Sequence, residues 1–118
     1  MGWKKMSPET AALLEEAVGP FACQKRKMFG HESYFVNNNM WTGVFEDRIF
    51  VRLSEADRQQ ALERESEAAV FEPLTGRPMR EYIEVPASIY DGPGFESWLQ
   101  DSYAYVSSLP PKEPKKKK

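Results

Sequence analysis

The chain has too little cysteine and histidine for the commonest thiol and metal chemistries. Cys23 is its one cysteine and His31 its one histidine. One cysteine cannot form an internal disulfide, and the two residues together are too few for a zinc site within one chain. They flank an expected strand, which would hold them roughly 25 Å apart at about 3.3 Å per residue. This geometry disfavours a catalytic dyad.

Several other functional signatures are missing. The sequence has no GxGxxG motif, no Walker loop and no nucleophile elbow. No run approaches the roughly 18 apolar residues of a membrane helix, and residues 1–6 contain no signal-peptide core. We therefore expect no catalytic residue, no metal, no cofactor and no membrane contact, which favours a cytoplasmic domain.

What remains is the composition of one globular domain. The 118 residues are 41% hydrophobic, 13% aromatic and 29% charged, an ordinary balance for a folded protein. A chain of this length can bury a core without disulfides or metals. We expect one domain over residues 7–108 and a disordered basic tail over residues 109–118.

Charge is divided unevenly along the chain. The net charge is −2, but five lysines and one glutamate give residues 110–118 a charge of +4, which leaves −6 for the rest. An acidic body argues against a nucleic-acid-binding body. The tail lysines are candidates for a weak nucleic-acid contact, or they only keep the chain soluble; they are Lys115, Lys116, Lys117 and Lys118.

Three helices are expected from capping signals and periodicity. The first begins at Ser7-Pro8 and ends at Gly19-Pro20. The second runs from Ser54 to about Arg64 and is so polar that it should lie on the surface. The third follows residues 91–94, and its buried face is formed by Phe95, Trp98, Leu99, Ser102 and Val106.

Short alternating runs predict an antiparallel sheet. The expected strands are residues 25–29, 34–36, 40–45, 48–53, 70–73 and 79–85. Asn37 to Asn39 form a turn signal, and Pro73 confines its strand to an edge of the sheet. The expected order is helix, three or four strands, helix, two strands, helix, with the helices packed on one face.

Alternation also predicts which side chains face the core. Ile49, Val51 and Leu53 should be buried under the helices. Phe50 lies between them in sequence and should point to the opposite face. Gly43 should leave room for a large ring across the sheet, such as that of Phe50.

The face opposite the helices is a candidate interaction surface. Strict alternation places Trp41, Gly43 and Phe45 on one side of their strand and Met40, Thr42 and Val44 on the other, and either set could lie beside Phe50. The candidate residues are Trp41, Phe45 and Phe50, with the neighbouring edge strand as the alternative contact. Exposed aromatic area on a sheet face is a common sign of a partner, either another protein or a second copy in a homodimer. The alternative is that arginine stems and the segment with Trp3 cover this face.

One further basic cluster lies in the body. Lys25, Arg26 and Lys27 are consecutive, and the aromatic residues Tyr34, Phe35 and Trp41 beside them would suit an RNA-binding sheet face. Alternation, however, divides the three charges between two faces of a strand and prevents a single patch. We expect them to mark a charged edge strand.

Several ordered segments together resemble the N-terminal domain of the TfoX/Sxy family. They are residues 27–30 (KMFG), 39–44 (NMWTGV), 49–53 (IFVRL), 71–79 (FEPLTGRPM) and 82–86 (YIEVP), followed by the helix with Trp98. The resemblance implies an α+β fold of two layers with an antiparallel sheet, in the order α-β(3)-α-β(2)-α. Full-length members are bacterial regulators of natural competence that act with a cyclic-AMP-responsive transcription activator, and the resemblance implies no catalytic residue.

The residues and the resemblance together suggest two functions. The first is a small non-enzymatic regulatory or protein-interaction domain. The alternative is a nucleic-acid-associated protein that uses the lysine tail.

Overall fold

The computed structural model describes residues 7–28, 31–65, 67–74, 76–90 and 92–110. These residues form three α-helices, a short 3₁₀ helix and one antiparallel sheet of six strands. Their order is α1 (Pro8–Val18), β1 (Gln24–Met28), β2 (His31–Val36), β3 (Asn39–Phe45), β4 (Arg48–Arg52), α2 (Glu55–Arg64), β5 (Ala69–Leu74), β6 (Arg77–Glu84), η1 (Ala87–Ile89) and α3 (Pro93–Ser108).

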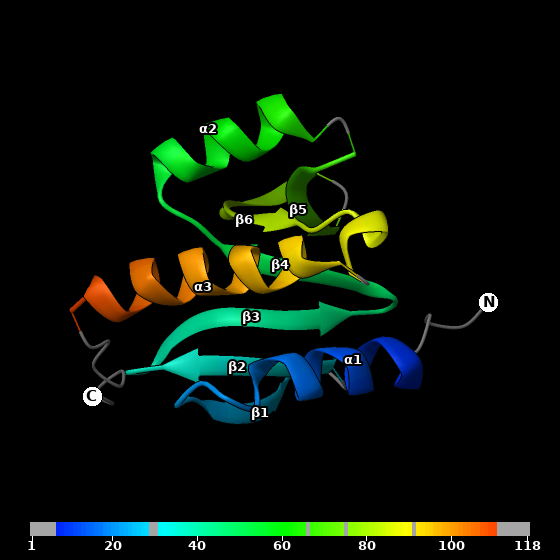
Figure 1. The fold of residues 1–118 in the computed structure, drawn as a ribbon, viewed down its shortest axis with the longest axis vertical. Helices are drawn as coiled ribbons and strands as arrows, with labels where there is room; N and C mark the ends of the chain where they lie inside the picture. The colour runs from blue at the N-terminus through cyan, green and yellow to red at the C-terminus, as the bar shows by residue number, and fades with distance from the viewer. Residues whose placement is uncertain (1–6, 29–30, 66, 75, 91, 111–118) are drawn as a thin grey trace.

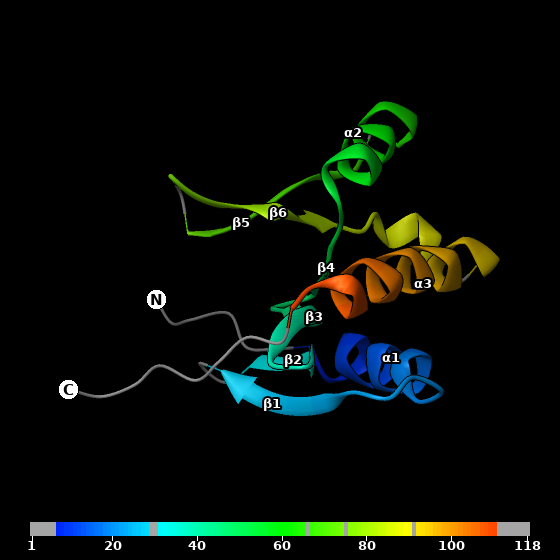
Figure 2. The same cartoon turned by 90° about the vertical axis from the view of Figure 1, so that its left-hand side faces the viewer.

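The helices and the sheet form two layers. Strands lie side by side in the order β1-β2-β3-β4-β6-β5. In Figure 1, α3 crosses in front of the central strands and α1 in front of β2. Figure 2 shows all three helices on the same side of the sheet. This confirms the expected α+β class and the packing of the helices on one face.

The expectation of three strands before α2 is wrong, because the order is α-β(4)-α-β(2)-α. The extra strand arises where β1 and β2 form a hairpin over their whole length, with Gln24 opposite Phe35 and Met28 opposite His31. β2 thus begins at His31, three residues before the expected start at Tyr34, and it is a strand separate from β1.

The predicted helix starts are confirmed. The Ser7 hydroxyl accepts a hydrogen bond from the Thr10 amide, and the Ser54 hydroxyl accepts one from the Asp57 amide, each at 3.2 Å. These bonds satisfy amides that have no partner within their own helix. α2 buries none of its side chains, as its polar sequence predicts.

The core lies between the sheet and helices α1 and α3. Ile49 and Val51 of β4 are fully buried there, and Leu53 nearly so, which confirms their predicted direction. The helices contribute Leu14, Val18, Phe95, Leu99 and Val106. Burial of such side chains is the main stabilising contribution in a domain of this size.

A β-bulge at Trp41 overturns the expected alternation of β3. Tyr34 pairs with Thr42 and Phe35 with Met40, so Trp41 is an extra residue without an opposite partner in β2. Trp41 and Thr42 are both fully buried, as happens when a bulge inserts a residue into one strand. The Trp41 indole N–H donates to the Leu99 carbonyl at 3.3 Å. Trp41 therefore lies under α3, on the side opposite to the one predicted.

The two edges of the sheet are of different kinds. β5 is an edge strand, as Pro73 predicts, and its pairing with β6 shifts register twice. β1 forms the other edge, where Lys25, Arg26 and Lys27 are exposed. Charged side chains on an edge oppose uncontrolled strand pairing.

Candidate functional site

The sheet face that the described helices leave uncovered carries a cluster of aromatic rings and arginines. We call it the open face; its residues are Met40, Phe45, Arg48, Phe50, Arg52, Phe71 and Tyr82. Phe50 and Phe71 stack with their ring centroids 4.3 Å apart, and Phe45 meets Phe71 edge-on at 5.7 Å. Tyr82 meets Phe50 edge-on, also at 5.7 Å. Strands β3 to β6 thus share one set of ring contacts.

The absence of a side chain at Gly43 leaves space for the Phe50 ring to pack against β3. The two residues are opposite each other in the β3–β4 register. A Cβ atom at Gly43 would lie 2.7 Å from the Phe50 ring carbon Cζ and 2.9 Å from the Ser33 hydroxyl. The expectation that this glycine leaves room for a ring is confirmed.

Two arginines lie over the edges of the ring cluster. The guanidinium of Arg48 is 5.2 Å from the Phe45 centroid, and that of Arg52 is 5.7 Å from the Tyr82 centroid. The guanidinium groups of both arginines therefore lie over rings of the open face, which is in keeping with the expected alternative that arginine side chains cover part of it. Trp3, the other expected cover, lies outside the described residues.

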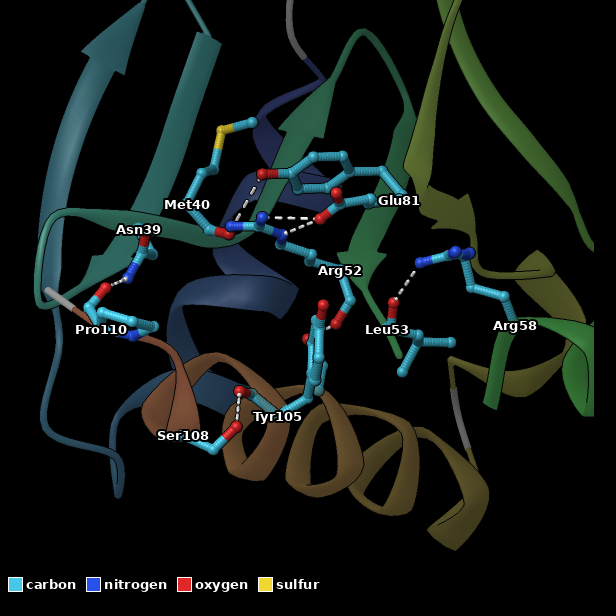
Figure 3. Close-up of polar contacts among 11 residues, drawn as sticks. Asn39, Met40, Arg52, Leu53, Arg58, Glu81, Tyr105, Ser108 and Pro110 are labelled. Atoms are coloured by element: carbon cyan, nitrogen blue, oxygen red, sulfur yellow. Dashed lines mark hydrogen bonds and ion pairs between the residues drawn. The ribbon is translucent and has the colours of Figure 1, made fainter. Parts of the chain in front are cut away.

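Both arginines are held by carboxylates. Arg48 pairs with Glu84 at 2.7 Å and with Glu46 at 3.2 Å. Arg52 pairs with Glu81 at 2.6 Å, as Figure 3 shows. Because these side chains are partly exposed, each pair contributes little to stability but fixes the direction of its guanidinium.

The hydroxyl of Tyr82 is a partly buried polar group of the open face. It donates to the Met40 carbonyl at 3.2 Å. Burial raises the pKa of Tyr82 to about 12, although the nearby charge of Arg52 acts in the opposite direction. The phenol therefore remains a neutral donor at physiological pH.

The structure separates the three aromatic residues that the sequence singled out. Phe45 is half-buried on the open face, whereas Phe50 is only 4% exposed beneath Phe71. Trp41 lies on the other side of the sheet. The surface as a binding site stays a prediction, and it now centres on Phe45 and its neighbours.

Sequence reasoning missed three members of the open face: Met40, Phe71 and Tyr82. All three lie within the expected strands. Tyr82 could have been assigned to this face, because it is next to the apolar Ile83 and neighbouring side chains of a strand point to opposite faces. The stacking of Phe71 on Phe50 depends on the order β4-β6-β5, in which β6 lies between their strands. No local pattern encodes that order.

Cys23 and His31 lie at opposite ends of β1, as the sequence predicts. Cys23 immediately precedes Gln24, whereas His31 pairs with Met28 at the far end of the hairpin. The His31 ring stacks on Phe45 at 4.7 Å. Burial raises the pKa of the Cys23 thiol, which keeps it protonated and weakly nucleophilic.

The described residues contain no group of three or more histidine, cysteine, aspartate or glutamate side chains placed to hold a metal ion. Within the same residues, no helix is both long and apolar enough to cross a membrane. Lys115 to Lys118, the candidate nucleic-acid tail, lie outside the described part of the chain.

A helix layer on one side of an antiparallel sheet, with rings and paired arginines on the other, defines a small two-layer α+β domain. The chain belongs to the TfoX N-terminal domain family, whose model matches residues 12–106. This confirms the resemblance found in the sequence. No curated protein and no solved structure matches the chain.

Proposed function

We propose that this chain is a non-enzymatic regulatory domain of the bacterial cytoplasm that acts by binding protein, and that the open face is its contact surface. The observation that carries the proposal is the set of half-buried side chains on that face: Met40, Phe45, Arg48, Arg52 and Tyr82. Methionine, aromatic residues and arginine are the residue types enriched in protein interfaces. Arginine and tyrosine also dominate binding energy where they are well packed.

The partner that we propose for this surface is a second copy of the chain. A two-fold dimer places the same patch against itself, so the patch must be self-complementary. The open face carries both signs of charge in alternating pairs, Arg48 with Glu84 and Arg52 with Glu81. In a dimer, each arginine can exchange its own glutamate for the glutamate of the other copy.

Sedimentation velocity across a range of protein concentrations tests the proposal. We expect the wild type to associate into a dimer as the concentration rises. Met40→Glu places a new carboxylate in the open face and should give a monomer. The matched control is Leu62→Glu, since Leu62 is 40% exposed on α2 and receives the same charge in the helix layer.

Two results would overturn the proposal. The first is a wild type that stays monomeric at every concentration. The second is dissociation by Leu62→Glu but not by Met40→Glu, because that pattern would place the contact on the helices.

A further inference from the structure

The outer side of strand β1 is an exposed edge of the sheet. β1 (Gln24–Met28) pairs with β2 alone, and Figures 1 and 2 show no described helix or strand beyond it. Gln24, Lys25, Arg26 and Lys27 are all exposed. On an edge strand, the N–H and C=O groups that point away from the neighbouring strand have no partner in the sheet. β1 therefore presents a row of backbone donors and acceptors to solvent.

The backbone of β1 is regular enough to accept another strand. It pairs with β2 in one register over all five residues, from Gln24 opposite Phe35 to Met28 opposite His31. The other edge strand, β5, contains Pro73 and shifts register twice against β6. Proline and bulges oppose strand addition, because they remove a donor and bend the strand. Of the two edges of the described sheet, β1 is thus the one open to a further strand.

Contacts on both faces of the sheet hold β1 in its extended conformation. The Lys25 ammonium pairs with Glu15 of α1 at 3.4 Å and with Glu32 of β2 at 3.3 Å. On the other face, Arg26 donates to the Asn38 side-chain oxygen of the β2–β3 turn at 2.6 Å. A strand that is already ordered loses little conformational entropy when a partner binds to it.

The charges along β1 are only partly compensated. Lys25 is balanced by its two carboxylates, whereas Arg26 is bound by side-chain amides, which carry no charge. Among the described residues, Lys27 forms no ion pair, and Glu32, which lies opposite it in the register, pairs with Lys25. Two uncompensated positive charges therefore follow each other along β1, one on each face of the sheet.

This charge selects the kind of strand that can add to the edge. Antiparallel pairing with the β1 strand of a second copy would place three consecutive cations opposite three others. Like charges directly opposite each other destabilise a sheet. A strand with two consecutive acidic residues reverses the sign of the interaction, because one carboxylate lies opposite Arg26 and the other opposite Lys27. Charge complementarity thus favours an acidic partner and disfavours a second copy.

We propose that β1 binds an extended acidic segment of another protein, which adds to the six-stranded sheet as a further antiparallel strand. Backbone hydrogen bonds to β1 supply the affinity, and two neighbouring acidic side chains supply the specificity, as is usual where a peptide extends a sheet. This contact is made at the edge of the sheet and goes beyond the dimer that we propose for the open face. A peptide titration tests it, whereas sedimentation tests the dimer, so the failure of one leaves the other standing.

Nuclear magnetic resonance of the isotope-labelled full chain, titrated with the peptide acetyl-Thr-Val-Glu-Glu-Val-Thr-amide, tests the proposal. We expect the backbone amide signals of Gln24–Met28 to shift in a saturable way. Lys27→Glu should weaken binding about fivefold, since it sets a carboxylate opposite a carboxylate. The matched control is Arg80→Glu, which makes the same charge change at an exposed position of β6, with three strands between it and β1. This control should bind the peptide like the wild type.

Two methylated peptides test for strand addition itself. Successive N–H groups of a strand point to opposite sides in the plane of the sheet, so one alternate set faces β1 and the other faces solvent. N-methylation of the first, third and fifth residues removes one set, and N-methylation of the second, fourth and sixth residues removes the other. We expect one methylated peptide to bind like the parent and the other at least tenfold more weakly, because it has lost its donors to β1. A contact made by side chains alone would not distinguish the two.

Several results would overturn the proposal. One is the absence of a saturable shift at β1 with millimolar peptide, and another is equal binding of the two methylated peptides. Equal weakening by Lys27→Glu and Arg80→Glu, or equally tight binding of a peptide with lysine in place of both glutamates, would refute the selection by charge. A shift of the β1 amides that grows with protein concentration in the absence of peptide would make a second copy the occupant of the edge.

Discussion

Because Gly43 has no side chain, the Phe50 ring of the open face can pack directly against β3. We expect Gly43→Ala to lower the free energy of unfolding by about 1–3 kcal/mol, because overpacking forces a buried neighbour to move. The Phe50 ring is that neighbour, with its Cζ atom 2.7 Å from the added carbon. Urea unfolding of the two proteins measures the difference.

Gly94→Ala is the matched control for this prediction. An added Cβ there has its nearest contact at 3.6 Å, with the Ile89 side chain. Alanine is also the better helix former, by about 1 kcal/mol in a helix interior. Gly94→Ala should therefore leave stability unchanged or raise it, and a loss equal to that of Gly43→Ala would contradict the steric account.

The buried phenol of Tyr82 gives a prediction about alkaline pH. Its pKa is about 12 in the folded protein against 10.0 as the ordinary value. As the pH rises past 10, the unfolded chain releases this proton before the folded chain does, so the free energy of unfolding should fall between pH 10 and 12. Tyr82→Phe should make that fall shallower, and should cost about 1 kcal/mol at pH 7 through the lost hydrogen bond to Met40. Equal slopes for the two proteins in urea unfolding at pH 9 and pH 11 would contradict this.

At the scale of elements, the sequence predicts helix starts well because capping is local. Ser7 and Ser54 each cap an amide three residues on, and both signals are readable without knowledge of the fold. The direction of the β4 side chains is equally local, because alternation continues without interruption from Ile49 to Leu53.

The bulge at Trp41 could not be predicted in the same way. A bulge depends on the register between β2 and β3, and a shift of one residue reverses the face of every side chain beyond it. The large indole gains burial under α3 by joining Thr42 on the same side. Tertiary packing therefore outweighs the alternation that the sequence displays.

Helix α2 should be the least stable helix of the fold. None of its side chains is buried, whereas Phe95, Leu99, Ser102 and Val106 anchor α3. A helix of 10 residues is marginal without tertiary packing. We expect its amides to exchange with deuterium at least tenfold faster than those of central α3, by hydrogen exchange with mass spectrometry. Equal protection of the two helices would contradict this.

At the scale of the whole molecule, the two layers have different charge and different exposure. The helix layer carries the acidic excess, and the open face carries rings with arginine–glutamate pairs. The sequence predicts the aromatic and arginine content of the open face, because Phe50 lies between Arg48 and Arg52 in a strand whose other side chains face the core. Two contacts of the β2–β3 turn could not be predicted, the hydrogen bond from Arg26 to Asn38 and the one from Asn39 to Pro110. They depend on where the turn lies relative to β1 and to the end of α3.

The central claim is that the open face is where the protein binds a second copy. Hydroxyl-radical footprinting at low and high protein concentration tests it directly. The account predicts that Met40, Phe45 and Tyr82 become protected as concentration rises, while Trp98 of the helix layer is oxidised at the same rate throughout. Unchanged oxidation of those three residues, or protection of Trp98 in their place, would contradict it.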